Sequence, residues 1–230
     1  MIRVNVLAEG QTEMSFVKSS LNNYFRGQII LDSRRVLTSR DNHISHEYRG
    51  GMINYLKAKN DILHWLSEDK GAYVTTMFDF FRLPTDFPKH AEAMKCPDHR
   101  KAVSILEEAL KEDITSAPDY RDRPERFIPY IQLHEFEALL FTDVRVLKED
   151  YLEPDEQKSL DDLYEETKVI PPEEINHGSE TAPSKRLLQA VDYQKGDPCI
   201  WIDTLTVPAI KNKCPHFSEW LDSLSSLAVL

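Results

Sequence analysis

The 230-residue chain is poor in the residues that mark several special protein classes. It has 7 glycines and 13 prolines, too few for a collagen-like or flexible-linker chain. Its three cysteines, Cys96, Cys199 and Cys214, are far apart, and none lies in a C-x-x-C pair, so neither a disulfide framework nor a zinc site is predicted. No apolar run reaches the roughly 20 residues that span a bilayer. We expect a cytoplasmic protein with no membrane association.

The chain also lacks an excess of positive charge. It carries 28 Lys and Arg against 39 Asp and Glu, a formal net charge of −11, so any contact with nucleic acid must be local. What it does have is apolar and aromatic residues, at 41% and 10%, which is enough for a folded core. The basic residues that are candidates for a local contact are Arg34, Arg35, Arg40, His43, His46 and Arg49, with Lys185, Arg186, Lys211 and Lys213 later. Scattered, solvated charges are the alternative interpretation of this set.

Strand-like and helix-like segments alternate through the first 142 residues. The predicted strands are residues 1–8, 28–31, 35–37, 72–78 and 127–133; the predicted helices are residues 13–25, 53–66, 98–113 and 135–141. This alternation predicts an α/β fold with a parallel sheet and covering helices. Residues 143–230 are predicted to form a helical appendage that completes the site and packs on the 1–142 core.

Acidic residues follow three of these strands. Glu9 follows the first, Asp79 the fourth, and Glu135 and Glu137 the fifth. Because the carboxyl ends of parallel strands meet at one edge of a sheet, we expect these side chains to converge. Carboxylate oxygens suit Mg²⁺ or Mn²⁺. The alternative is that each acid only caps the helix that follows it.

Several motifs together resemble a bacterial Toprim-like family of unknown function, which is similar to the Toprim domains of OLD-type (overcoming lysogenisation defect) nucleases. The resemblance spans essentially the whole chain. The stretches that carry it are VLAEGQTE (6–13), TMFDFF (76–81), PYIQLHEFEALL (129–140), PSKRL (183–187) and CPHF (214–217). It implies a Toprim-like, Rossmann-like sheet and a Mg²⁺- or Mn²⁺-dependent nuclease acting on DNA or RNA.

The resemblance also implies roles for individual residues. Glu9 would bind metal or transfer a proton, and Asp79 would bind metal. Where Toprim enzymes have a second aspartate, this chain has Phe81, so Glu135 or Glu137 would supply the missing ligand. Lys185 would offset charge that develops on the phosphate.

Partners are implied only by the resemblance. OLD-like defence proteins suggest an ABC-type ATPase as partner in an antiphage system, and the chain itself has no G-x-x-x-x-G-K-[ST] motif. The sequence is compatible with a homo-oligomer. The competing hypothesis is a catalytically inactive Toprim-like module that binds a partner ATPase or a nucleotide, with Phe81 marking the decay of the metal site. A third is hydrolysis or transfer of phosphate on a small nucleotide.

Overall fold

The computed structural model describes residues 1–35, 54–120, 123–175, 178, 180–194 and 198–228. Its strands are β1 (Ile2–Ala8), β2 (Ile29–Arg35), β3 (Tyr73–Asp79), β4 (Phe127–Ile128) and β5 (Ile131–Gln132). Its α-helices are α1 (Gln11–Phe16), α2 (Asn22–Tyr24), α3 (Tyr55–Glu68), α4 (His90–Ala93), α5 (His99–Thr115), α6 (Pro154–Thr167), α7 (Pro183–Ala190), α8 (Pro198–Leu205), α9 (Val207–Lys213) and α10 (Pro215–Ser226). Among the described residues no helix combines the length and the apolarity that crossing a bilayer requires.

The strands form one parallel sheet in the order β2-β1-β3-β4, with β5 pairing the far end of β3. The register sets Ala8 of β1 opposite Arg35 of β2 and Met77 of β3, so the carboxyl ends of these three strands lie at the same edge. The predicted α/β class with a parallel, Rossmann-like sheet is confirmed. The position of Glu9 and Asp79 follows from this register.

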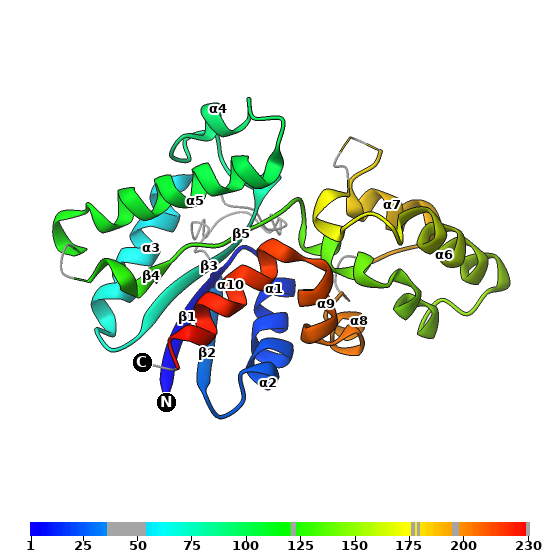
Figure 1. The fold of residues 1–230 in the computed structure, drawn as a ribbon, viewed down its shortest axis with the longest axis horizontal. Coiled ribbons are helices and arrows are strands. Elements are labelled where there is room, and N and C mark those ends of the chain that lie inside the picture. Colours follow the sequence, from blue (N-terminus) through cyan, green and yellow to red (C-terminus); the bar gives the residue numbers. More distant parts are fainter. Residues whose placement is uncertain (36–53, 121–122, 176–177, 179, 195–197, 229–230) are drawn as a thin grey trace, which may run out of the picture.

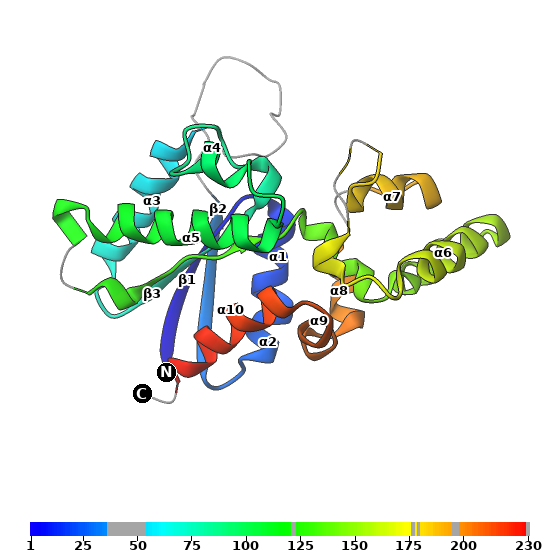
Figure 2. The same ribbon diagram turned by 45° about the horizontal axis from the view of Figure 1, so that its top comes forward.

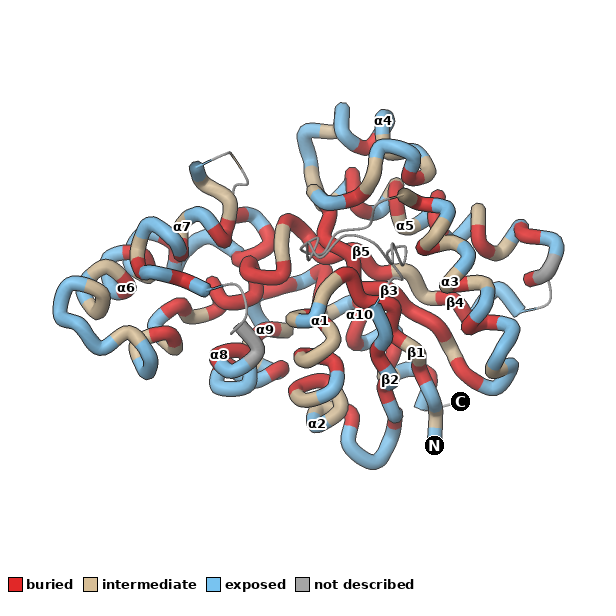
Figure 3. Tube along the Cα trace, turned by 180° about the vertical axis from the view of Figure 1, so that it is seen from behind, coloured by how far each residue is buried: buried red, intermediate tan, exposed pale blue. Residues whose placement is uncertain are grey.

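Helices cover both faces of the sheet (Figure 1). On one face, α1 and α10 bury apolar residues such as Phe16 and Phe217 against Val4 and Val6 of β1. On the other face, α3 and α5 pack against Leu7. Alternating side chains of one strand thus enter two separate cores, as the period of two in a strand requires. Figure 3 shows the buried strands running through the middle of this three-layer arrangement.

The chain beyond residue 142 is helical and leaves the sheet before it returns (Figure 2). Helices α6 to α9 lie to one side, and α10 then packs on the sheet. The indole of Trp220 stacks on Tyr130 with ring centroids 4.2 Å apart, and its Nε1 donates to Thr75 Oγ1 at 2.9 Å. The segment therefore includes a helix that belongs to the core layer.

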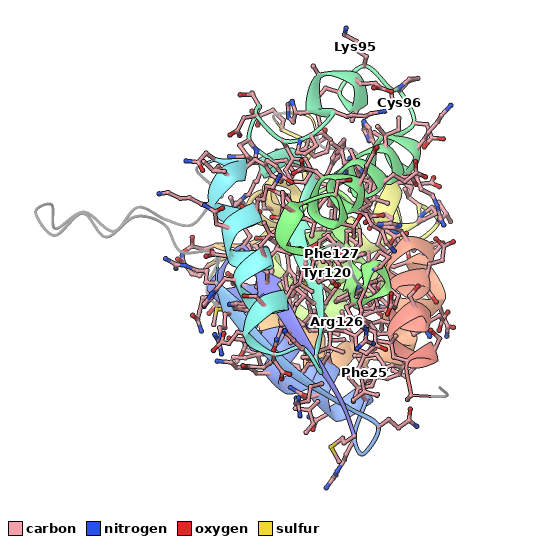
Figure 4. All side chains as sticks on the ribbon, turned by 90° about the vertical axis from the view of Figure 1, so that its left-hand side faces the viewer. Phe25, Lys95, Cys96, Tyr120, Arg126 and Phe127 are labelled. Atoms are coloured by element: carbon pink, nitrogen blue, oxygen red, sulfur yellow. The ribbon has the colours of Figure 1, made fainter. Side chains whose placement is uncertain are left out.

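The opposite end of the sheet is fixed by a buried arginine. The guanidinium of Arg126, labelled in Figure 4, donates to the carbonyl oxygens of Leu66, Asp69 and Ala72. Leu66 and Asp69 lie at the end of α3, where carbonyls lack partners within the helix. Arg126, which directly precedes β4, thereby connects the end of α3 to the start of β3 and to β4.

Two predicted strands, residues 28–31 and 35–37, were wrong as separate elements. The structure has one continuous strand, β2, through Asp32 and Ser33, which the prediction treated as a break. Because β2 lies at the edge of the sheet, Asp32 can face solvent, and the hydroxyl of Ser33 donates to the carbonyl of Met14 at 3.2 Å. Polar residues are tolerated there because an edge strand is not enclosed on both sides. Residues 36 and 37 lie outside the described residues.

The predicted strand 127–133 is two short strands. Pro129 between them has no N–H to donate, and the hydroxyl of Thr76 bridges the gap: it accepts from the backbone N–H of Tyr130 at 2.9 Å and lies 2.8 Å from its carbonyl. The predicted helix 135–141 is a 3₁₀-helix, Phe136–Thr142. Its residues are buried on all sides, so no amphipathic pattern favours an α-helix there.

Candidate functional site

Glu9 and Asp79 meet at the carboxyl edge of the sheet. Glu9 directly follows β1, and Asp79 is the last residue of the neighbouring β3. One carboxylate oxygen of Glu9, Oε2, accepts the backbone N–H of Asp79 at 3.1 Å. Both side chains are buried: Glu9 is 4% exposed and Asp79 is 3% exposed. The predicted convergence of these two acids is therefore present in the fold.

Glu13 is a third acid at the same place. It lies in the first turn of α1, four residues after Glu9, and is 7% exposed. Its Oε2 is buried and accepts no hydrogen bond from the described residues. A Cβ on Gly10 would lie 2.7 Å from this oxygen, so a larger residue at position 10 would make the carboxylate shift. An unsatisfied buried carboxylate oxygen is costly unless a cation or proton shares it.

Glu137 supplies a fourth acid from the 3₁₀-helix. It is 7% exposed, and the phenolic O–H of Tyr193, a residue between α7 and α8, donates to its Oε1 at 3.3 Å. Glu135 points elsewhere: its Oε2 accepts the backbone N–H of Ser184 at 3.0 Å, at the start of α7. Of the two acids that follow the last strand, Glu137 lines the pocket described below, whereas Glu135 holds a helix N-terminus.

Arg82 is the cation among these acids. Its guanidinium lies 3.9 Å from a carboxylate oxygen of Glu9 and 3.6 Å from one of Asp79. Burial alone would lower the pKa of Arg82, but the charges of Asp79, Glu9, Glu137 and Glu135 raise it above its ordinary value. One guanidinium therefore offsets several carboxylates at longer than ideal hydrogen-bond distance.

The pKa values of two of these acids show how poorly the negative charge is compensated. Burial, together with the charges of Glu9, Glu13 and Glu137, raises the pKa of Asp79 well above its ordinary value. Burial, with a smaller contribution from Glu137, also raises the pKa of Glu13. Each shift means that ionisation of the carboxyl group is less favourable here than in water, and a nearby positive charge would favour it.

The acids open into a pocket of about 800 Å³. Its charged lining consists of Glu9, Glu13, Asp79, Glu137, Arg35 and Arg82. Leu188 and Tyr193 line it from α7 and the segment that follows. The site thus lies between the sheet edge and the helical part of the chain.

The donor set fits a hard divalent cation, which binds to carboxylate oxygens. The buried, unsatisfied Oε2 of Glu13 and the raised pKa values of Asp79 and Glu13 are the observations that support this fit. Within the described residues, however, no three His, Cys, Asp or Glu side chains are placed as a ready-made metal site. Binding would therefore require rotation of some of these side chains.

Other candidates from the sequence lie away from this pocket. Lys185 is exposed on α7 and is not among the residues that line it. His134 is buried, and its Nε2 lies 2.9 Å from the carbonyl oxygen of Glu173. Phe81, in the position of the second aspartate, stacks on His134 with ring centroids 5.6 Å apart. Arg40, His43, His46 and Arg49 lie outside the described residues.

Sequence reasoning missed Glu13, Arg82 and Tyr193. Glu13 had a signal, since it begins the helix predicted over residues 13–25, directly after the turn that follows Glu9. Arg82 had a weaker one, because it comes three residues after Asp79 in a short turn that the sequence did not mark as helical. Tyr193 had none, because its contact with Glu137 joins residues 56 positions apart.

Comparison with known families places most of the chain in one family. The family model described as "Domain of unknown function (DUF4276)" matches residues 8–225. The chain belongs to this family. The match begins just before Glu9 and includes every residue of the pocket discussed above. Neither the curated proteins nor the solved structures contain a significant match to this DUF4276 chain.

Proposed function

We propose that the protein is a Mg²⁺- or Mn²⁺-dependent nuclease of Toprim type that hydrolyses phosphodiester bonds. The observation that carries the proposal is the group of four buried carboxylates, Glu9, Glu13, Asp79 and Glu137, which line one pocket together with Arg82. Acids that served only as helix caps would not need to share a pocket or to shift one another's pKa.

In this proposal Glu9, Asp79 and Glu137, with Glu13, hold the cation. A bound divalent ion would polarise a phosphodiester and activate a water for its hydrolysis. The chain's own contribution is to orient the carboxylates: the backbone N–H of Asp79 fixes Glu9, and the phenol of Tyr193 fixes Glu137. Arg82 offsets part of the charge of Glu9 and Asp79. Lys185, to which the resemblance assigned the charge on the phosphate, does not line the pocket.

The resemblance to OLD-like proteins extends the proposal to a cytoplasmic antiphage system with an ABC-type ATPase as partner. The proposed substrate is DNA or RNA, and the proposal is compatible with a monomer or a homo-oligomer.

The test is a cleavage assay with the full chain. Supercoiled DNA, tRNA and single-stranded oligonucleotides are incubated with and without Mn²⁺, using wild type, Asp79→Asn and Asp155→Asn. Asp155 is an exposed carboxylate on α6 outside the pocket and serves as the matched control. We expect metal-dependent cleavage that Asp79→Asn abolishes and Asp155→Asn retains. Absence of cleavage by the wild type on every substrate, or equal cleavage by both variants, would overturn the proposal.

A second candidate function is a catalytically inactive module that binds a partner ATPase or a nucleotide. Phe81 favours it, because this residue packs against Phe80, His99 and His134 instead of contributing a carboxylate. The same assay separates the two: the inactive module binds its ligand without any metal-dependent cleavage.

A further inference from the structure

One arginine at the edge of the acid pocket has no partner in the described part of the chain. Arg35 is the last residue of β2. In the sheet register it lies opposite Ala8, the residue that precedes Glu9 in the chain. It is exposed and lines the pocket together with the carboxylates. Within the described part of the chain its guanidinium forms no hydrogen bond or ion pair, whereas the guanidinium groups of most other described arginines do. The arginines held by partners include Arg3, Arg34, Arg100, Arg123, Arg126, Arg145 and Arg186.

The neighbouring residue shows that this freedom is specific to Arg35. Arg34 precedes it on the same strand and points to the opposite face, as alternation in a strand requires. Arg34 lies 3.7 Å from Asp32 and 3.6 Å from Glu68, and its guanidinium lies over the ring of Trp65 at 4.8 Å. Arg34 is therefore held by contacts within the fold, whereas Arg35 lines the pocket.

Charge explains what an unpaired arginine at this point can bind. The carboxylates alone would repel a phosphate, and Arg82 is already engaged by Glu9 and Asp79. A guanidinium offers a planar set of donors that matches phosphate oxygens. Arg35 is therefore positioned to attract an anion to the mouth of a pocket that would otherwise exclude it.

We propose that Arg35 binds a backbone phosphate of a nucleic-acid strand and thereby positions the strand across the carboxylate pocket. The inference rests on the proposed function, which supplies the cation between the acids and the substrate. It assigns Arg35 as a positioning residue for the substrate backbone. The exposed side chain of Leu188, on the α7 side of the same pocket, supplies an apolar surface for the sugar or base.

The test is equilibrium binding of a short fluorescein-labelled oligodeoxythymidine, followed by fluorescence anisotropy over a range of salt concentrations. Ca²⁺ replaces Mg²⁺, and a gel verifies that the probe stays intact. The full-length proteins compared are wild type, Arg35→Ala and the matched control Arg34→Ala. Inorganic phosphate is titrated as a competitor to separate a backbone phosphate from a free one.

We expect Arg35→Ala to weaken binding several-fold and to lower the slope of log Kd against log salt by about 0.7, the value for one phosphate contact to a single strand. Arg34→Ala should leave the slope at the wild-type value. Equal slopes for the two variants, no binding of the oligonucleotide by wild type, or displacement by inorganic phosphate at concentrations similar to those of the oligonucleotide would each overturn the inference.

The proposed function and this inference can fail separately. If the wild type binds the oligonucleotide through Arg35 but never cleaves it, the nuclease proposal is wrong and the proposed phosphate contact of Arg35 is retained. If the wild type cleaves nucleic acid with metal, but Arg35→Ala and Arg34→Ala bind the oligonucleotide equally well, the nuclease proposal is retained and the proposed role of Arg35 is wrong.

Discussion

At the scale of single residues, the site is a group of buried carboxylates that line one pocket with Arg35 and Arg82. Burial and the charges of Glu9, Glu13 and Glu137 raise the pKa of Asp79, and burial and the charge of Glu137 raise the pKa of Glu13. The guanidinium of Arg82 lies within 4 Å of two of these carboxylates, those of Glu9 and Asp79. The sequence predicted Glu9 and Asp79 because each ends a strand. It could not predict Arg82, because that contact depends on the turn after β3.

The first prediction concerns Arg82→Gln. In EDTA, removal of the guanidinium leaves the carboxylates with less compensation, so we expect a loss of about 1–2 kcal/mol in the free energy of unfolding. Added Mn²⁺ should raise the melting temperature of Arg82→Gln more than that of wild type, because the cation then replaces a missing charge. Differential scanning fluorimetry with and without Mn²⁺ measures both effects, and Arg123→Gln, an exposed arginine paired with Glu125, is the control. An equal response to Mn²⁺ in wild type and Arg82→Gln would contradict this role.

At the scale of elements, α10 is held on the sheet by polar contacts that the sequence did not reveal. Both carboxylate oxygens of Glu173 accept backbone N–H groups at the start of α10, from His216 at 2.9 Å and Phe217 at 2.8 Å. Nε2 of His216 lies 3.0 Å from Glu107 of α5. The sequence predicted that this part of the chain is helical and packs on the core. It could not predict Glu173 as its cap, since the two are about 43 residues apart in the chain, as the contact to His216 records.

The second prediction is that Glu173→Ala destabilises the protein by about 2 kcal/mol, because two backbone donors of α10 lose their acceptors. Glu174→Ala, the adjacent and exposed glutamate, should change the free energy of unfolding by less than about 0.5 kcal/mol. Urea unfolding followed by circular dichroism measures both. Similar losses in the two variants would show that the cap does not stabilise α10.

The third prediction is that the free energy of unfolding depends on pH through the protonation of His216. Burial would lower the pKa of His216, but the hydrogen bond to Glu107 and the charges of Glu107 and Glu173 raise it above its ordinary 6.5. A raised folded-state pKa means that the stabilisation is fully present below about pH 6.5 and is lost as the pH rises through the folded-state value. The difference in stability between wild type and His216→Gln should therefore shrink as the pH increases. A difference that stays constant or grows with pH would contradict it.

At the scale of the whole molecule, the sequence predicted the α/β class and the edge at which the acids gather, because parallel strands fix both. It did not predict which later acid faces the pocket. Glu137 does, since the 3₁₀-helix turns it toward Tyr193, whereas Glu135 turns to Ser184. That choice depends on where α7 and the residues after it lie against the sheet edge. The segment beyond residue 142 is thus part of the site, because Leu188 and Tyr193 come from it.

The central claim is that the carboxylate pocket binds a divalent cation, and titration calorimetry with Mn²⁺ tests it most directly. Wild type, Asp79→Asn and Asp155→Asn are titrated after removal of metal with EDTA and dialysis. The account predicts saturable binding by wild type and Asp155→Asn, and at least a tenfold weaker affinity for Asp79→Asn, roughly 1.4 kcal/mol of binding free energy. No saturable binding by wild type, or equal affinity in all three proteins, would contradict it.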